Sequence, residues 1–126
     1  MSEAVILREI LLALSALKRP DGKRMCAAWR MQSGVFQGIH GGPPSRIGFN
    51  GVSDIIGWVH IADKAVFLAV EVKSARGRPT PEQAHFLETV NAAGGIAFVA
   101  RSAEEACSEV LVRCKLLDPR PSSDLK

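Results

Sequence analysis

The chain lacks the features that mark secreted, membrane-spanning or zinc-binding proteins. It has three cysteines among 126 residues, an odd number without close paired spacing, which predicts neither a disulfide framework nor a zinc site. No apolar run near the N-terminus is longer than residues 10–14, which is too short to cross a bilayer. Charged residues at positions 3, 8 and 9 argue against a signal peptide, so we expect a cytoplasmic protein without a membrane partner.

Acidic residues are scarce in one part of the chain. Between residues 18 and 53 there is one acid, Asp21, against six bases: Lys18, Arg19, Lys23, Arg24, Arg30 and Arg46. From residue 79 onward acids outnumber bases, so the net charge is only +3. A basic side suggests a polyanionic partner, although charge alone fits a solvated face equally well.

The length and composition are those of one globular domain. A chain of 126 residues can build one hydrophobic core but not two, and 47% hydrophobic with 23% charged residues is ordinary for a globular protein. We therefore predict a single domain over residues 1–118, followed by a disordered tail over residues 119–126.

Apolar periodicity predicts alternating helices and strands. Helices are expected over residues 3–17, from residue 80 to the glycine pair at 94–95, and over residues 102–114; strands are expected at 24–31, 52–59, 65–73 and 96–100. The glycine-rich stretch from 33 to 51 predicts a long loop, which in a small domain is usually functional or mobile.

The order of these elements predicts an α/β fold. The strand at 65–73 is apolar on both faces, which implies helices on both sides of the sheet. Thr80, Pro81 and Gln83 form a capping box at the start of the following helix. That helix connects the strand to the one at 96–100, so the two strands should be parallel. We expect a mixed β-sheet flanked by helices.

The two central strands should form a hairpin whose turn is centred between Ala62 and Asp63. This register places Asp54 opposite Glu71, and directly opposed residues share a face with Cβ atoms about 4.5–5.5 Å apart. Lys73 lies two residues beyond Glu71 and therefore points to the same face. A bulge or a shifted turn would break the register.

Two carboxylates at this spacing repel each other unless a positive charge lies between them. Mg²⁺ takes one or two carboxylates and leaves its other positions to water and phosphate. The backbone carbonyl of Val72 could add a ligand, while Lys73 would orient the attacking water and stabilise charge on the phosphate. The alternative is an edge salt bridge, since Glu-x-Lys alone is a weak pattern.

The combination of motifs resembles the VRR-Nuc domain, a branch of the PD-(D/E)xK nuclease superfamily. The similarity covers residues 3–105 and is carried by GVSDIIG at 51–57, VEVK at 70–73, TPEQ at 80–83 and GGIAFVA at 94–100. Stand-alone members from phages and bacteria are most similar. Ser53 replaces the proline that precedes the aspartate in the superfamily, a tolerable departure because that proline supplies no ligand.

The resemblance implies a restriction-endonuclease-like fold and a role for each matching residue. Asp54 and Glu71 match metal ligands for Mg²⁺ or Mn²⁺, and Lys73 matches the catalytic lysine. Gln83 matches a motif glutamine beside the site. Glu3 matches an N-terminal acid that can join the metal shell.

Several of these roles have alternatives. Gln83 is either catalytic or only a helix cap, and Glu9 is the rival of Glu3 for the metal shell. Ser33 corresponds to a phosphate-contacting serine of junction resolvases, but a plain turn explains it equally well.

Four arginines are candidates for binding DNA phosphates. Arg76 and Arg78 flank the catalytic motif, and the alternative is a flexible solvated loop. Arg30 and Arg46 belong to the basic segment.

We therefore predict a metal-dependent DNA endonuclease of a bacterial or phage-infected cell that cuts branched DNA such as four-way junctions. The alternative is a non-catalytic DNA-binding module on a nuclease-like fold. A homodimer is expected because symmetric junction cleavage needs two equivalent sites. The first helix carries a wide apolar surface that suggests an interface, unless the glycine-rich loop or the C-terminal helix covers it. Trp29 and Trp58 are expected to be core or interface residues.

Overall fold

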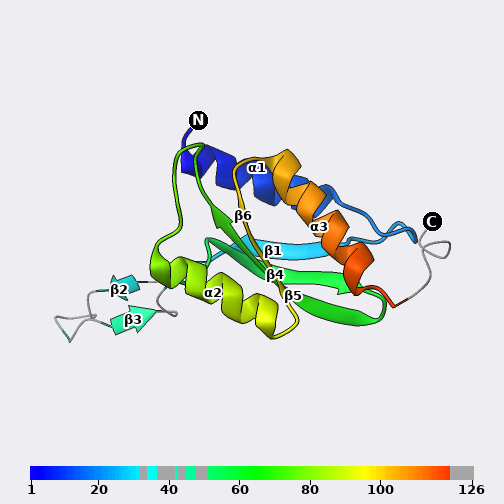
Figure 1. Ribbon diagram of the computed structural model, residues 1–126. Helices are drawn as coiled ribbons and strands as arrows, with labels where there is room; N and C mark the ends of the chain where they lie inside the picture. The colour runs from blue at the N-terminus through cyan, green and yellow to red at the C-terminus, as the bar shows by residue number, and fades with distance from the viewer. Residues whose placement is uncertain (32–33, 37–41, 43–44, 48–50, 120–126) are drawn as a thin grey trace.

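A computed structural model of the protein describes residues 1–31, 34–36, 42, 45–47 and 51–119. The elements run in the order α1 (Glu3–Ala16), β1 (Cys26–Arg30), β2 (Gly34–Phe36), β3 (Ser45–Ile47), β4 (Ile55–Ile61), β5 (Lys64–Val72), α2 (Pro81–Ala92), β6 (Ile96–Ala100) and α3 (Ala103–Leu117) (Figure 1). Among these residues no helix is both long and apolar enough to span a membrane. Most of the predicted tail, residues 120–126, lies outside the described residues.

Four strands form a mixed sheet in the order β1-β4-β5-β6. β1, β4 and β5 pair antiparallel, whereas β5 and β6 pair parallel through the α2 crossover, as the sequence predicts. The β4–β5 register also confirms the predicted hairpin, because Ile55 faces Val70 and Ile61 faces Lys64 across a turn at Ala62 and Asp63. Asp54 and Glu71, at the open end of the hairpin, therefore lie where the predicted register places them.

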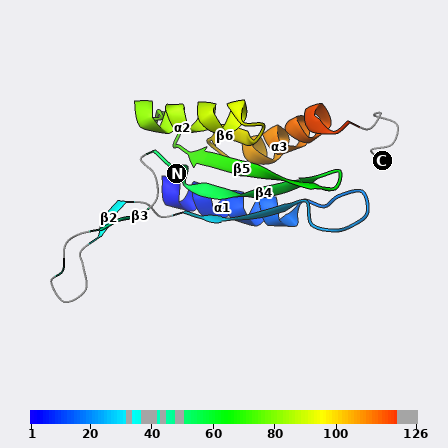
Figure 2. The same ribbon diagram turned by 90° about the horizontal axis from the view of Figure 1, so that it is seen from below.

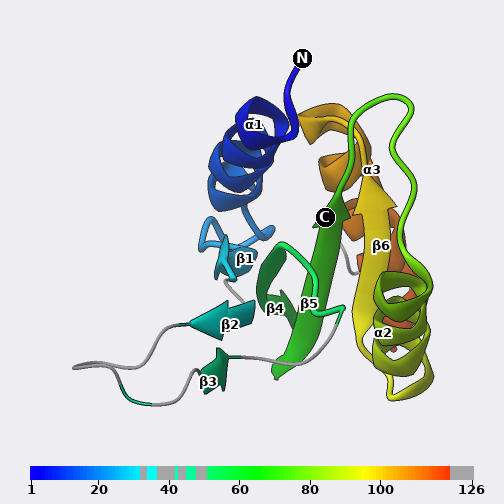
Figure 3. The same cartoon turned by 90° about the vertical axis from the view of Figure 1, so that its left-hand side faces the viewer.

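The helices cover the two faces of the sheet unequally. α1 and α3 pack together on one face, where the larger core contains Ile10 and Leu14 of α1 and Val110 of α3. α2 packs on the other face through Leu87 and Val90, against Ala69 of β5 and its neighbour on β6. Figure 3 shows α1 and α3 above the sheet and α2 below it. The fold is therefore an α/β sheet flanked by helices, of the restriction-endonuclease-like type.

Side-chain caps fix where the helices begin. Ser2, Thr80 and Ser102 each accept a backbone N–H from the residue three positions on, which satisfies one of the free donors of the first turn. At Thr80 the box is reciprocal, because Gln83 Oε1 accepts the Thr80 N–H at 2.8 Å. α3 continues to Leu117, three residues beyond the predicted end.

Two expectations about exposure and loops are wrong. β5 is buried on both faces only from Leu68 onward, and Phe67 is 44% exposed because α2 covers only the later half of the strand. For α1 the structure agrees with one of the alternatives left open, since the sheet and the C-terminal helix α3 cover part of its apolar surface, although Leu12 remains exposed. The stretch predicted as a loop contains β2 and β3, which form a separate two-stranded sheet (Figure 2).

Gly57 allows β1 and β4 to approach closely. A Cβ at this position would collide with the Ala27 carbonyl and lie 2.6 Å from Ala28 Cα, both of which are backbone atoms that cannot rotate away. We expect Gly57→Ala to lower the free energy of unfolding by roughly 3 kcal/mol or more in urea titrations. The control is Gly94→Ala, where the added Cβ meets no atom within 4 Å. Its only penalty is the left-handed backbone conformation (φ 95°), which should lower the free energy of unfolding by about 1–2 kcal/mol. Equal losses in the two variants would contradict the steric explanation.

Candidate active site

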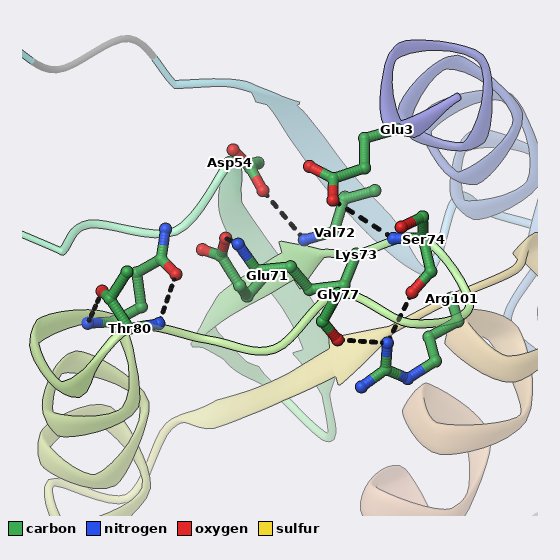
Figure 4. Close-up of polar contacts among 10 residues, drawn as sticks. Glu3, Asp54, Glu71, Val72, Lys73, Ser74, Gly77, Thr80 and Arg101 are labelled. Atoms are coloured by element: carbon green, nitrogen blue, oxygen red, sulfur yellow. Dashed lines mark hydrogen bonds and ion pairs between the residues drawn. The ribbon is translucent and has the colours of Figure 1, made fainter.

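Asp54 is held between the ends of three strands. It directly precedes β4, and its backbone carbonyl accepts the N–H of Met31 at 2.7 Å, just after β1. Its Oδ2 accepts the N–H of Val72, the last residue of β5, at 2.9 Å (Figure 4). Two backbone N–H groups from different parts of the sheet therefore hold Asp54, one at its carbonyl and one at its carboxylate.

Glu71 is a buried carboxyl group beside Asp54. The residue is 1% exposed, and neither carboxyl oxygen has an aligned hydrogen bond within the described part of the chain. Burial is the main cause that raises the pKa of Glu71 to about 8, and the neighbouring Asp54 raises it further, whereas Lys73 opposes the shift. Burying a carboxyl group without hydrogen bonds disfavours its charged form, which is the direction of this pKa shift.

Lys73 supplies one cation to this pair. Its Nζ lies 3.3 Å from Glu71 Oε2, and its side chain is 13% exposed. The backbone N–H of Lys73 donates to the Ala100 carbonyl at 3.1 Å, which extends the β5–β6 pairing by one residue. Because the pKa of Glu71 stays near 8 despite this contact, Lys73 alone does not compensate the buried carboxylate.

The backbone carbonyl of Val72 faces the same side as Asp54. In a trans peptide the carbonyl of one residue and the N–H of the next point in opposite directions. The Lys73 N–H points to β6, so the Val72 carbonyl points away from β6, toward the side on which the Val72 N–H meets Asp54. This orientation agrees with the expectation that the carbonyl could serve as a ligand.

Glu3, the candidate N-terminal acid, contacts the loop that follows Lys73. Glu3 Oε2 accepts the Ser74 N–H at 3.2 Å (Figure 4). Glu3 borders the same cleft as Asp54, whereas Glu9 borders a different hollow. Across the described residues, no three His, Cys, Asp or Glu side chains gather closely enough to hold a metal ion. Asp54 and Glu71 are thus the carboxylates best placed to bind a metal ion. That Glu3 joins the metal shell stays a prediction.

Gln83 acts as the helix cap that the sequence suggests. Its side-chain oxygen is engaged with the Thr80 N–H, and its own N–H donates to Thr80 Oγ1 at 3.2 Å. The segment that leads to Asp54 lies against this first turn, since a Cβ on Gly51 would come within 2.8 Å of Gln83 N. The capping role is therefore present, and the catalytic role of Gln83 stays a prediction.

Arg101 was missed by the sequence reasoning. One guanidinium nitrogen donates to the carbonyls of Ser74 and Gly77 at 2.5 and 2.6 Å, which ties down the loop after Lys73 (Figure 4). The available signal was the predicted parallel pairing of β5 with β6, which brings the residue after Ala100 beside the residues after Val72. Arg101 therefore holds the loop after Lys73 in place from the end of β6.

The structure describes only some of the residues predicted to bind DNA. Arg76 and Arg78 are exposed in the loop after Lys73, with no ion pair among the residues described, and Arg30 borders the cleft beside Asp54. Arg46 lies in β3, but its side chain is not described, and Ser33 falls outside the described residues.

Trp29 and Trp58 are surface residues rather than core residues. They pack edge-to-face with ring centroids 5.8 Å apart and are 45% and 38% exposed. Trp58 faces Phe67 across the β4–β5 ladder, so the three aromatic side chains share the half of the sheet face that α2 leaves open. This aromatic patch, defined by Trp29, Trp58 and Phe67, fits the interface alternative of the sequence interpretation.

Together, the mixed sheet and the carboxylates at the ends of β4 and β5 define a restriction-endonuclease-like, nuclease-like domain. Residues 45–104 match the family model described as the VRR-NUC domain, which confirms the resemblance for this part of the chain. The matched segment contains Asp54, Glu71 and Lys73. No curated protein and no solved structure matches the chain. The VRR-NUC match identifies a domain that acts on DNA.

Proposed function

We propose that the protein is a Mg²⁺- or Mn²⁺-dependent DNA endonuclease. The observation that carries this proposal is the buried carboxyl group of Glu71 beside Asp54, which has an ion pair with Lys73 but no hydrogen bond from any described residue. A divalent cation between the two carboxylates would satisfy both and would lower the pKa of Glu71 below neutrality. With two carboxylates and the Val72 carbonyl as ligands, the donor set is of the all-oxygen kind that Mg²⁺ and Mn²⁺ prefer.

Each residue of the site has a separate role in the hydrolysis of a phosphodiester. Asp54, Glu71 and the Val72 carbonyl would hold the metal ion, which supplies an acidified water and charge stabilisation. Lys73 orients the attacking water and stabilises the negative charge that develops on the phosphate as one P–O bond forms and the other breaks. Arg101 and Glu3 keep the loop after Lys73 in place through the carbonyls and the N–H that they contact.

The rival proposal is a DNA-binding module that has lost catalysis. A degenerate module would be expected to lose at least one of Asp54, Glu71 and Lys73, yet all three are present and gathered. Incubating supercoiled plasmid with the purified protein tests the choice. We expect nicking with Mn²⁺ and none with EDTA, whereas binding without nicking under both conditions would favour the module.

We further propose that the enzyme is a homodimer that cuts branched DNA, with four-way junctions as the leading substrate. Cleaving a junction symmetrically needs two equivalent sites, which a two-fold dimer provides. The support in this chain is the aromatic patch, because clustered exposed aromatic side chains are enriched at protein interfaces. A cleavage panel of duplex, flap, fork and junction substrates would test the substrate preference.

The assembly can be tested by disrupting the aromatic patch. We expect light scattering at micromolar concentration to give about twice the 13.6 kDa chain mass for the wild type and the monomer mass for Trp58→Glu. Leu12→Glu is the matched control, since Leu12 is 71% exposed on α1, away from the patch, and should leave the dimer intact. A monomeric wild type would contradict the proposal.

The exposed arginines after Lys73 should contribute to affinity independently of base sequence. In the Arg76→Gln/Arg78→Gln variant we expect binding to weaken to a similar degree for unrelated duplexes, because phosphates are common to all of them. The slope of log K against log[salt] should also become shallower by about 1 for each lost phosphate contact. Fluorescence anisotropy over a salt series measures both quantities. Binding that is insensitive to salt would show that the basic side does not bind phosphate.

A further inference from the structure

A cleft of about 610 Å³ opens beside the site between α1 and β1. Its lining includes Asp54 and Val72 from the site, Leu7, Arg8 and Leu11 from α1, and Arg30 from β1. Figure 3 shows α1 lying beside β1, which agrees with the contacts between them. The cleft therefore continues directly from the candidate metal ligands along the first helix.

The two arginines of the cleft are free to bind a ligand. Arg8 and Arg30 are exposed, and neither forms a hydrogen bond or ion pair with any described residue. By contrast, Arg19 forms an ion pair with Asp21, and Arg113 forms one with Glu109 one helical turn before it. Two unpaired guanidinium groups beside one catalytic carboxylate are suited to phosphates, which arginine binds in a bidentate manner.

The remaining lining agrees with a nucleic acid strand. Leu7 and Leu11 are partly buried and give the α1 wall an apolar surface, against which the sugar of a nucleotide can lie. The other acid of the cleft, Glu3, is engaged with the Ser74 N–H. A divalent cation on Asp54 would remove the second negative charge, so the loaded cleft would be positive overall.

We infer that this cleft binds the DNA strand next to the phosphate that is cut, with Arg8 and Arg30 on its flanking phosphates. The inference rests on the proposed endonuclease function and assigns Arg8 of α1 to the substrate site. It makes the first helix part of the DNA-binding surface, in addition to the loop after Lys73.

The test compares Arg8→Gln/Arg30→Gln with Lys64→Gln, a control that neutralises an exposed base at the far turn of the hairpin. Binding is measured in an inactive Lys73→Ala background, which keeps the proposed metal ligands, with a labelled single strand and a labelled duplex over a salt series. We expect the arginine variant to reduce the salt slope by about 1.4 on the single strand and about 1.8 on the duplex, corresponding to two lost phosphate contacts. The lysine control should leave both slopes unchanged.

Cleavage by the otherwise intact enzyme gives the second readout. We expect kcat/KM of Arg8→Gln/Arg30→Gln to fall at least about tenfold. Unchanged circular dichroism and thermal stability would show that the variant is folded, as expected for two exposed side chains. If the wild type cuts DNA with Mn²⁺ but the arginine variant keeps its salt slope and kcat/KM, the cleft inference is wrong and the nuclease proposal stands. A wild type that neither binds nor cuts DNA would overturn both.

Discussion

Glu71→Gln should abolish DNA cleavage, with a loss on the order of 10³-fold or more in rate. The substitution keeps the size of the side chain but removes the charge that would bind the divalent cation. Asp54→Ala and Lys73→Ala should cause losses of similar size, because each removes a separate part of the same site. Plasmid nicking with Mn²⁺ at several enzyme concentrations measures the effect.

The control for this prediction is Glu82→Gln in the first turn of α2. Glu82 is an exposed acid close to the site along the chain, but no contact connects it to Asp54 or Glu71, so cleavage should be unchanged. Glu71→Gln should also remain folded, since a neutral amide is easier to bury than a carboxylate. Full activity in the Glu71→Gln protein would remove Glu71 from the mechanism.

The stability of the metal-free protein should fall as the pH rises from about 5 to 8. Glu71 has a pKa of about 8 in the folded state, against 4.5 for the ordinary group. Within this window the unfolded chain loses the proton that the folded chain keeps, so unfolding becomes easier by up to about 1.4 kcal/mol per pH unit. Above pH 8 both states are ionised and the contribution of Glu71 no longer changes.

Urea denaturation in EDTA at pH 5, 6.5 and 8 would measure this effect. The Glu71→Gln variant is the control, because it lacks the titrating group but keeps the rest of the site. We expect the wild type to lose stability relative to the variant as the pH rises. Mn²⁺ should stabilise the wild type more at pH 8 than at pH 5, since a carboxylate ligand must be deprotonated. Parallel curves for the two proteins would contradict an elevated pKa at Glu71.

The hairpin and its register were predictable because short-range geometry determines them. A tight turn at Ala62 and Asp63 fixes which residues of β4 and β5 face each other, and strand alternation then fixes their faces. The capping box at Thr80 is similarly local, since its two hydrogen bonds lie within three residues. The hairpin register alone is therefore enough to predict that Asp54 and Glu71 lie close together.

Features that depend on distant packing could not be predicted in this way. The exposure of Phe67 depends on where α2 crosses the sheet, which the apolar pattern of β5 does not contain. The sequence also does not determine which segment covers α1, because an apolar stripe shows that a helix is packed but does not identify its partner. The parallel pairing of β5 with β6 brings Arg101 near the loop after Lys73, but its partners are backbone carbonyls 24 and 27 residues earlier, which have no sequence signature of their own.

The hairpin also has a consequence for how homologous chains can change in length. The turn at Ala62 and Asp63 lies at the far end of β5 from Glu71, yet the face on which Glu71 emerges is counted from that turn. If the two-residue turn were kept, adding or deleting one residue in β5 next to it would move Glu71 from the side of Asp54 to the opposite side of the sheet, whereas a change of two residues would restore the side. Functional relatives that keep the turn should therefore vary this end of β5 by even numbers of residues, or absorb an odd change in a β-bulge before the glutamate.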